Sequence, residues 1–305
     1  MLSKTRASIG PFGEEDVKAF AAFSRDFNPL HLDPLYAGRT QFGQRIVYGV
    51  QVLLAGIEAI LDEPCQLIRI QSRFVAPVLL GEPVEVLVNS QRDSRVQLRY
   101  SSKGRIVTNA AVWLKPDASA CALDSKDNAS ALPELGLSQR SLEDFGQGEE
   151  GQIVCPINRT ALSKALLKTH QRPVFINSAQ AAAYALCSAI VGMRLPGALA
   201  VFIGLDADAS IETADTSVNA VALCYRLANI SREDRTLTTD VLPSSGPVRV
   251  QGSATAHVMN LYQPGFPRVQ SGSDLLADSE SNQVRPLRAE AAYVGRGLGT
   301  TVRLH

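Results

Sequence analysis

The stretch that decides the fold runs Phe23-Ser-Arg-Asp-Phe-Asn-Pro-Leu-His-Leu-Asp-Pro-Leu-Tyr-Ala-Gly-Arg-Thr-Gln-Phe-Gly-Gln-Arg-Ile-Val-Tyr-Gly49. Apolar residues recur at helical spacing just before it, which predicts a helix over residues 14–23. Pro29 and Pro34 interrupt helical geometry, so residues 26–33 are expected to form a turn. A second helix, over residues 49–61, presents a wide apolar face.

Asp26 and His31 are separated by a bend that can bring their side chains to one point. The Asn28-Pro29 step favours extended geometry between them, and their spacing suits no single helix face. A carboxylate and an imidazole that share a water molecule can move protons in both directions. Gly49 begins the apolar helix, where a backbone N–H has no intrahelical acceptor and can hold a developing oxyanion. The pattern therefore indicates an acid/base site beside an oxyanion donor.

Each of these residues also has a purely structural interpretation. Asp26 alone could cap a helix, and His31 alone could be a hydrogen-bonded loop histidine. Asn28 and Asp33 are typical turn-building residues. Tyr48 fits wall packing and contact with the site equally well. The occurrence of Asp26 and His31 together, with a helix start downstream, favours catalysis.

The rest of the first half has the alternation of β-strands. Strands are expected over residues 66–78 and 83–89, and two more within residues 95–114 around Lys103-Gly104. One long apolar helix followed by antiparallel strands is an α+β pattern, unlike the regular alternation of strands and helices that builds a parallel sheet.

The motif Asp26-Phe-Asn-Pro-Leu-His31, followed by Phe42-Gly43 and Ile46-Val-Tyr-Gly49, resembles that of the MaoC-like (R)-specific enoyl-CoA hydratase / dehydratase family. The resemblance covers residues 5–115 and includes Phe74-Val-Ala-Pro-Val-Leu-Leu-Gly-Glu-Pro-Val84. It implies a hot-dog fold, in which an antiparallel sheet wraps a long helix. It also implies a lyase that hydrates trans-2-enoyl thioesters or dehydrates (R)-3-hydroxyacyl thioesters.

The same resemblance assigns roles to residues. Asp26 and His31 would hold the catalytic water, the Gly49 amide would bind the thioester oxygen, and Asn28 and Tyr48 would contact the substrate.

Two positions depart from the family pattern: Tyr48 stands where histidine is usual, and Ile57 where the helix often has serine. The alternative function is therefore a catalytically idle protein that binds acyl thioesters or acyl carrier protein. A hot-dog thioesterase is less favoured, because the Asp-x-Asn-Pro-x-His arrangement belongs to hydration in this fold.

The second half repeats the order of one helix followed by strands. A helix is expected over residues 178–191, and strands over 198–205, 218–230, 236–242 and 247–258. Resemblance to the C-terminal repeat of two-domain MaoC-like proteins implies a tandem (double) hot-dog fold. No second Asp-x-Asn-Pro-x-His occurs, so this half is expected to be degenerate. We expect the halves to pair within the chain, sheet edge to sheet edge, with one active site.

Composition divides the chain into a catalytic domain at residues 1–118, an acidic linker at 119–150, the second domain at 151–262 and a tail at 263–305. The tail contains Gly295-Arg-Gly-Leu-Gly299, which departs from the dinucleotide-binding fingerprint and leaves no room for a βαβ unit after it. We therefore expect no nucleotide cofactor.

Thirty Lys and Arg balance thirty Asp and Glu, which gives no electrostatic reason to expect nucleic acid or an anionic membrane as a partner. The five cysteines are scattered and form no CxxC pair, which disfavours zinc and a disulfide framework and fits a cytoplasmic protein. No metal or cofactor is expected. The expected partner is an acyl-CoA or acyl carrier protein thioester, with homodimer formation left open.

Overall fold

The computed structural model describes residue 2 and residues 4–118, 135–167, 174–211, 220–243 and 247–262 of the chain. These residues all belong to one compact unit. The expected tail and residues 119–134 of the expected linker lie outside them. Within this part of the chain, every helix is too short or too polar to cross a membrane.

The first half has the expected order of helices and then strands. β1 (Arg6–Ile9) precedes α1 (Glu14–Ser24), two short helices, α2 (Pro29–Leu32) and α3 (Pro34–Gly38), and the long α4 (Gly49–Ile60). Then come β2 (Cys65–Phe74), β3 (Val84–Arg92), β4 (Arg95–Ser102) and β5 (Arg105–Pro116). Lys103 and Gly104 both have positive φ, as in the two-residue type I′ turns that join twisted antiparallel strands.

The second half repeats this order. The short 3-10 helix η2 (Leu142–Asp144) precedes β6 (Glu150–Pro156), α5 (Arg159–Leu166) and α6 (Ser178–Ala189), which leads into a π-helical turn, η3 (Ile190–Arg194). The remaining strands are β7 (Ala200–Ile211), β8 (Ala220–Ser231), β9 (Thr236–Leu242) and β10 (Val248–Val258). Our sequence analysis did not identify β1, β6 or α5, which are among the shortest elements and offer little periodicity.

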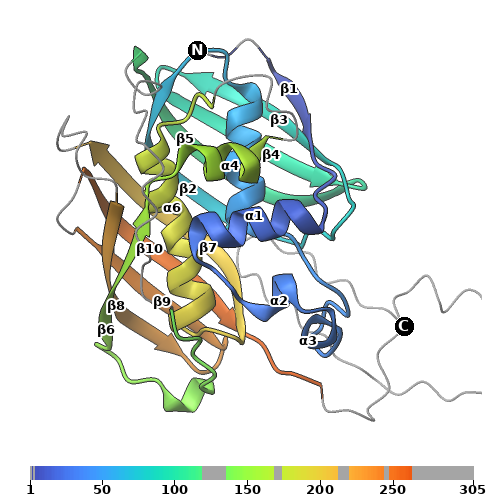
Figure 1. Cartoon of the computed structure of the whole chain (residues 1–305), viewed down its shortest axis with the longest axis vertical. Coiled ribbons are helices and arrows are strands. Elements are labelled where there is room, and N and C mark those ends of the chain that lie inside the picture. The colour runs from blue at the N-terminus through green and yellow to red at the C-terminus, as the bar shows by residue number, and fades with distance from the viewer. Residues whose placement is uncertain are drawn as a thin grey trace, which may run out of the picture. The chain divides into compact units, whose positions relative to one another are not determined.

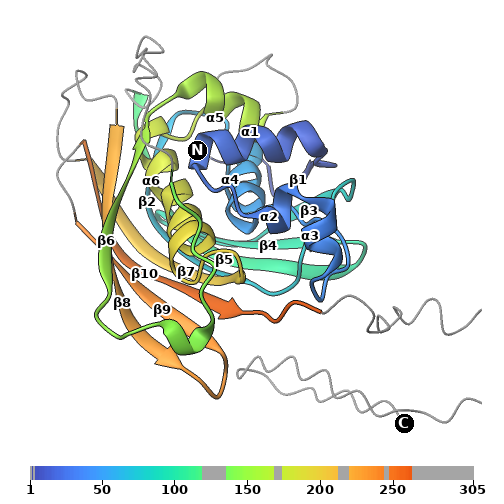
Figure 2. The ribbon, with the colours of Figure 1, turned by 60° about the horizontal axis from the view of Figure 1, so that its bottom comes forward.

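The described strands form one antiparallel sheet in the order β1-β3-β4-β5-β2-β7-β10-β9-β8-β6. The two halves of the sheet have the same strand order. From the outer edge to the centre, the first half runs β1-β3-β4-β5-β2 and the second half runs β6-β8-β9-β10-β7. The helices lie on one face of the sheet, and α4 and α6 run beside each other (Figures 1 and 2). This α+β arrangement is the expected tandem hot-dog fold.

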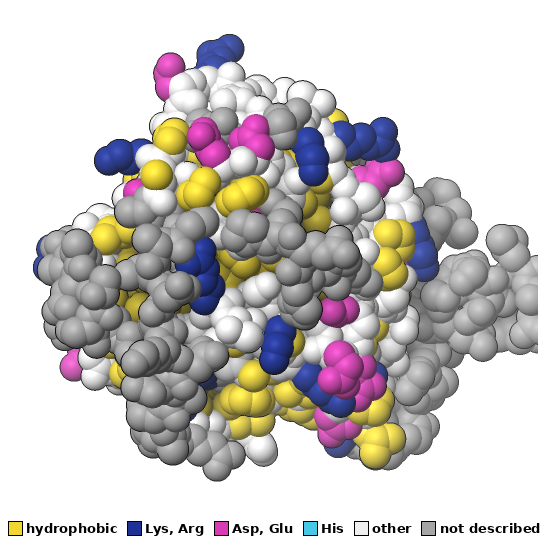
Figure 3. Space-filling view, turned by 45° about the horizontal axis from the view of Figure 1, so that its top comes forward, with side chains coloured by type: hydrophobic (Ala, Val, Ile, Leu, Met, Phe, Trp, Pro, Cys, Tyr) yellow, Lys and Arg dark blue, Asp and Glu magenta, His cyan; other side chains and the backbone are white. Residues whose placement is uncertain are grey.

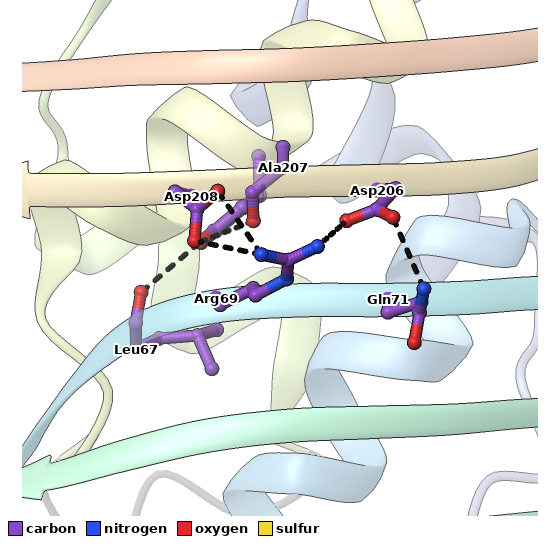
Figure 4. A network of polar contacts seen from close by, with 7 residues as sticks. Leu67, Arg69, Gln71, Asp206, Ala207 and Asp208 are labelled. Atoms are coloured by element: carbon purple, nitrogen blue, oxygen red, sulfur yellow. Dashed lines mark hydrogen bonds and ion pairs between the residues drawn. The ribbon is translucent and has the colours of Figure 1, made fainter.

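The halves join edge to edge through β2 and β7, which pair antiparallel from Arg69 opposite Asp208 to Arg73 opposite Gly204. On the face turned away from the helices, Arg69 forms ion pairs with Asp206 and Asp208, at 2.8 and 3.5 Å (Figure 4). Exposed pairs of this kind contribute little energy each, about 0.2–1 kcal/mol. These ion pairs therefore contribute more to the register of the β2–β7 pairing than to its stability.

Helix α6 supports this joint from the other face. The β2 ladder is irregular between Leu67 and Arg69, and α6 satisfies the backbone groups there. The Leu67 N–H donates to Gln180 Oε1 at 2.8 Å, and the Tyr184 hydroxyl donates to the Leu67 carbonyl at 3.1 Å. A helix of the second half is thus bonded to a strand of the first.

The core lies between the sheet and the helices. All residues of α6 are buried, and most are Ala, Ser or Cys, so the helix packs close to its neighbours. The surface carries mixed charge: Figure 3 shows acidic and basic side chains interspersed on one face, in keeping with the formal net charge of zero.

Candidate active site

The segment between α1 and α4 forms two short helices where the sequence predicted a plain turn over residues 26–33, and that prediction is wrong. Pro29 and Pro34 each occupy the first turn of a helix, where the missing N–H removes no hydrogen bond. The side chains of Asn28 and Asp33 cap these helices by accepting N–H groups of the first turn. Both residues therefore build the loop that carries the candidate site.

Asp26 lies just after α1 and is only 1% exposed. Ser188 Oγ donates to its Oδ2 at 2.7 Å, and the Asn28 backbone N–H donates to its Oδ1 at 3.1 Å. Burial raises the pKa of Asp26 to about 7, while the two hydrogen bonds oppose that rise. A carboxyl group that titrates near neutral pH can both take and return a proton under physiological conditions.

His31 lies on α2, with its Nδ1 2.9 Å from the carbonyl oxygen of Ile46. A carbonyl oxygen only accepts, so Nδ1 carries the hydrogen and Nε2 keeps its lone pair. Burial lowers the pKa of His31 to about 4. The side chain keeps partial contact with solvent. The imidazole is neutral at pH 7, and its Nε2 is a hydrogen-bond acceptor.

Tyr48 contacts both of these residues. Its hydroxyl donates to the backbone carbonyl of Asp26 at 2.5 Å, and its ring lies against that of His31, with centroids 3.7 Å apart. Burial raises the pKa of Tyr48 well above its usual value, so the hydroxyl stays protonated. Tyr48 is therefore a buried packing residue that also holds the backbone of Asp26 and the ring of His31 in place. Contact between Tyr48 and a substrate stays a prediction.

Gly49 follows directly and begins α4. Its N–H belongs to the first helical turn, and we find no acceptor for it among the residues described. A Cβ at this position would lie 2.8 Å from Phe74 Cδ1, so the close approach of that ring requires glycine. Gly49 is partly exposed. Its amide is a donor at the positive end of a helix.

Asn28 uses both amide hydrogens within the protein. Its Nδ2 donates to the carbonyl oxygens of Gly192 and Gly197, at 3.1 and 2.9 Å. These bonds tie the loop of the first half to the second half, and they favour a positioning role. Contact between Asn28 and a substrate stays a prediction that these bonds do not support.

The second half supplies two neighbours of Asp26 that our sequence analysis missed, Ser188 on α6 and Gly192 in η3. A Cβ on Gly192 would lie 2.2 Å from Asp26 Oδ1, so the backbone there abuts the carboxylate. The sequence predicted that the helix ends near Gly192, but a π-helical turn carries it on to Arg194. Such turns occur frequently at functional sites. In the sequence, the only indication of this turn was Gly192, a glycine at the end of an apolar helix.

The other residues singled out by the sequence have structural surroundings. Ile57 is fully buried on α4. Within the described ranges, no group of three or more His, Cys, Asp or Glu side chains could hold a metal ion. Cys155, Cys187 and Cys224 have free thiols. The glycine-rich string at 295–299 lies outside the described residues.

Replacing Asp26 with Asn is expected to stabilise the protein at alkaline pH. The carboxyl pKa is about 7 when folded and 3.8 in its ordinary state. As the pH rises from 3.8 to about 7, the unfolded wild-type protein loses this proton and the folded protein keeps it. The free energy of unfolding of the wild type therefore falls across this pH range. The shift corresponds to about 4 kcal/mol, an upper bound for the gain from Asn at pH 8.

Thermal unfolding at several pH values tests this. We expect the Tm of Asp26→Asn to exceed that of the wild type by several degrees at pH 8 and by much less at pH 5. Asp33→Asn, an exposed change in the same loop that keeps a good helix cap, is the control and should show no such trend. A difference between Asp26→Asn and wild type that does not vary with pH would contradict the raised pKa.

Comparisons with known proteins agree with this fold. A family model for the MaoC like domain matches residues 3–111. An (R)-specific enoyl-CoA hydratase of Aeromonas caviae is 38% identical over 90 residues, which cover 28% of this chain and 67% of the hydratase. A mitochondrial 3-hydroxyacyl-[acyl-carrier-protein] dehydratase of Arabidopsis thaliana is 29% identical over 150 residues, which cover 46% of this chain and 87% of the dehydratase.

Among solved structures, a conserved hypothetical protein of Mycobacterium tuberculosis with a double hot-dog fold matches at a TM-score of 0.51 and 13% identity. The match covers 83% of this chain and 94% of that one. At this identity the likeness shows the fold alone.

Fold and relatives together define the class as a double hot-dog hydratase or dehydratase, which is a lyase. The chain belongs to the MaoC-like dehydratase family. The Asp26–His31 motif, Gly49 and Phe74 all lie within the residues that the family model matches.

Proposed function

We propose that this protein catalyses the reversible hydration of trans-2-enoyl thioesters to (R)-3-hydroxyacyl thioesters, with Asp26 and His31 activating the water. The observation that carries the proposal is that Tyr48 contacts both the backbone of Asp26, whose buried carboxyl group has a pKa raised to about 7, and the ring of His31, a neutral imidazole whose Nε2 can accept a hydrogen bond. The names of the relatives, an enoyl-CoA hydratase and a 3-hydroxyacyl dehydratase, support the substrate class.

In the proposed reaction, water donates one hydrogen bond to the Asp26 carboxylate and one to His31 Nε2. An oxygen lone pair then faces Cβ of the enoyl group. Asp26 takes a proton as the O–Cβ bond forms, and the electrons of the Cα=Cβ bond shift toward the thioester oxygen. The protonated Asp26 returns the proton to Cα as the thioester carbonyl reforms. One molecule of water is added on one face, and Asp26 regains its charge.

The thioester oxygen carries negative charge between these two steps, and the Gly49 N–H is the donor we propose for it. Gly49 is partly exposed, and its amide lies at the positive end of α4. A preorganised donor of this kind contributes about 3 kcal/mol to the transition state in other enzymes.

We further propose one active site per chain, within a catalytic domain at residues 1–118 and a degenerate domain at 151–262. The segment between α5 and α6, residues 167–177, is shorter than its counterpart at 25–48 and contains no Asp-x-Asn-Pro-x-His. The second half would then shape and support the site of the first. The free cysteines fit a cytoplasmic location.

The alternative is an idle binding protein, motivated by the departures at Tyr48 and Ile57. A direct assay separates the two: purified protein is mixed with crotonyl-CoA, longer enoyl-CoA esters and an enoyl-acyl carrier protein, and the loss of enoyl absorbance is followed. We expect turnover to an (R)-3-hydroxyacyl product, with the preferred carrier given by the faster arm. Binding without turnover would support the idle protein, and release of free thiol without hydration would indicate a thioesterase.

A further inference from the structure

One aromatic side chain of the second half reaches the candidate site of the first. Phe202 lies on β7, the strand that pairs with β2 at the joint between the halves. Its ring meets the ring of Phe74 edge to face, with the centroids 5.3 Å apart. Phe74 in turn lies against Gly49, the proposed donor to the thioester oxygen. Only the ring of Phe74 therefore separates Phe202 from Gly49.

Phe202 also borders the candidate site on the side of the proposed base. It packs against a cluster of small side chains that includes Val191 in η3. The next residue, Gly192, has its backbone against the Asp26 carboxylate. The contacts that lead from Gly49 and from Asp26 therefore meet at Phe202.

A β-bulge turns the Phe202 side chain toward the helices. Leu205 has its side chain in the core, so regular alternation would send the side chain three residues earlier to the opposite face. The β7–β10 pairing shifts register here: Gly204 is opposite Thr255, but Phe202 is opposite Ala256, which leaves one extra residue on β7. Ala256 is buried, and residues opposite each other share a face of the sheet. Bulges re-aim side chains in this way and are frequent next to active sites.

We propose that Phe202 is a specificity-determining residue: its ring closes the acyl side of the candidate site and limits the length of the acyl chain that the protein accepts. This inference rests on the proposed function, in which the enoyl group reacts between Gly49 and Asp26. The acyl chain continues from the carbon that the water attacks. That water is held by Asp26, which lies against η3, so the chain extends toward the second half.

The side chains that surround Phe202 are small. Ala200, Ala254 and Ala256 are each at most 4% exposed, and with Val191 they form the cluster against which the ring packs. Phe202 itself is partly exposed, so the core does not enclose its ring on every side. Loss of the ring would leave a space walled by alanine and valine side chains. Such an apolar wall suits the methylene groups of a linear acyl chain.

A wall of this kind discriminates between acyl chains by their length. One methylene group more or less in an apolar pocket changes kcat/KM by about 10- to 200-fold. A long chain must displace the ring and reacts slowly, whereas a short chain ends before it. Removing the ring of Phe202 should therefore favour long chains, and enlarging it should penalise them. A merely structural role for Phe202 predicts the same loss for every chain length.

Three variants of the full-length protein test this, with crotonyl-CoA, trans-2-octenoyl-CoA and trans-2-dodecenoyl-CoA as substrates. We expect Phe202→Ala to raise the ratio of kcat/KM for dodecenoyl-CoA to that for crotonyl-CoA by about 10-fold or more. Phe202→Trp should lower this ratio, and Phe202→Leu should give a value between those of Phe202→Ala and wild type. Phe175→Ala is the matched control: it removes a partly buried phenyl ring of the second half near Cys65, at the other end of β2, and should keep the wild-type ratio.

The outcomes separate failure of this inference from failure of the proposed function. If folded Phe202→Ala and Phe202→Trp keep the wild-type ratio, or lose activity equally on all three esters, the inference is overturned, while turnover of crotonyl-CoA by the wild type upholds the function. A wild-type protein that hydrates none of the three esters would refute both together. Should Phe202→Ala not fold, the comparison of Phe202→Leu with wild type decides.

Discussion

Asp26→Asn will lower the hydration rate of an enoyl-CoA substrate by about two to four powers of ten, the usual contribution of a positioned acid or base. The amide keeps the shape of the carboxylate and can still bond to Ser188, but it cannot take a proton from water. The main loss should appear in kcat, because the group acts on the reacting atoms. Steady-state kinetics on purified, folded variant protein gives the measurement.

His31→Ala should lose a similar amount, because the water then lacks its second acceptor. The double variant should be little worse than either single one, since residues that act as a unit are not additive. Asp33→Asn is the matched control: it makes the same chemical change in the same loop, at an exposed cap, and should leave kcat near wild type. Near-normal turnover by folded Asp26→Asn would remove the proposed mechanism.

Gly192→Ala will sharply reduce activity although Gly192 lies outside the catalytic loop. The new Cβ would lie 2.2 Å from Asp26 Oδ1 and 2.6 Å from its Cγ, so either the carboxylate or the π-helical turn must move. A displacement of about 1 Å in a reacting group can reduce the rate about a hundredfold. Overpacking of this kind also destabilises by about 1–3 kcal/mol.

Kinetics and thermal unfolding of this variant should be measured together, so that the loss in kcat refers to folded protein. Gly136→Ala is the control, because its Cβ would meet nothing closer than Arg194 Nη1 at 3.8 Å. The control should retain kcat. Wild-type kcat in folded Gly192→Ala would show that the backbone near Asp26 yields easily, and that the site is less rigid than these distances imply.

The sequence predicted the elements whose signals are local. Periodicity located α1 and α4 to within a residue or two, and Lys103-Gly104 located the β4–β5 turn. The expected end of β7 at residue 205 was six residues early, because Asp206 and Asp208 are unusual in strands. The strand continues because these carboxylates pair with Arg69 across the joint between the halves.

The neighbours of Asp26 were beyond the reach of local signals. The loop that carries Asp26 and His31 could be recognised from its motif, since all its residues lie within one short segment. Ser188 and Gly192 are more than 150 positions away, and their approach depends on how one helix packs against another. Neither composition nor periodicity contains that information, so the sequence alone left Asp26 without its partners.

The covalent link between the halves has a consequence for dilution. Two separate subunits that met through β2 and β7 would part at low concentration, and their activity per molecule would fall. In this chain the second half stays tethered at a fixed, high local concentration, so the support it gives Asp26 does not depend on how much protein is present. The tether also ends the symmetry of such a pair, so each half can accept substitutions that its counterpart could not.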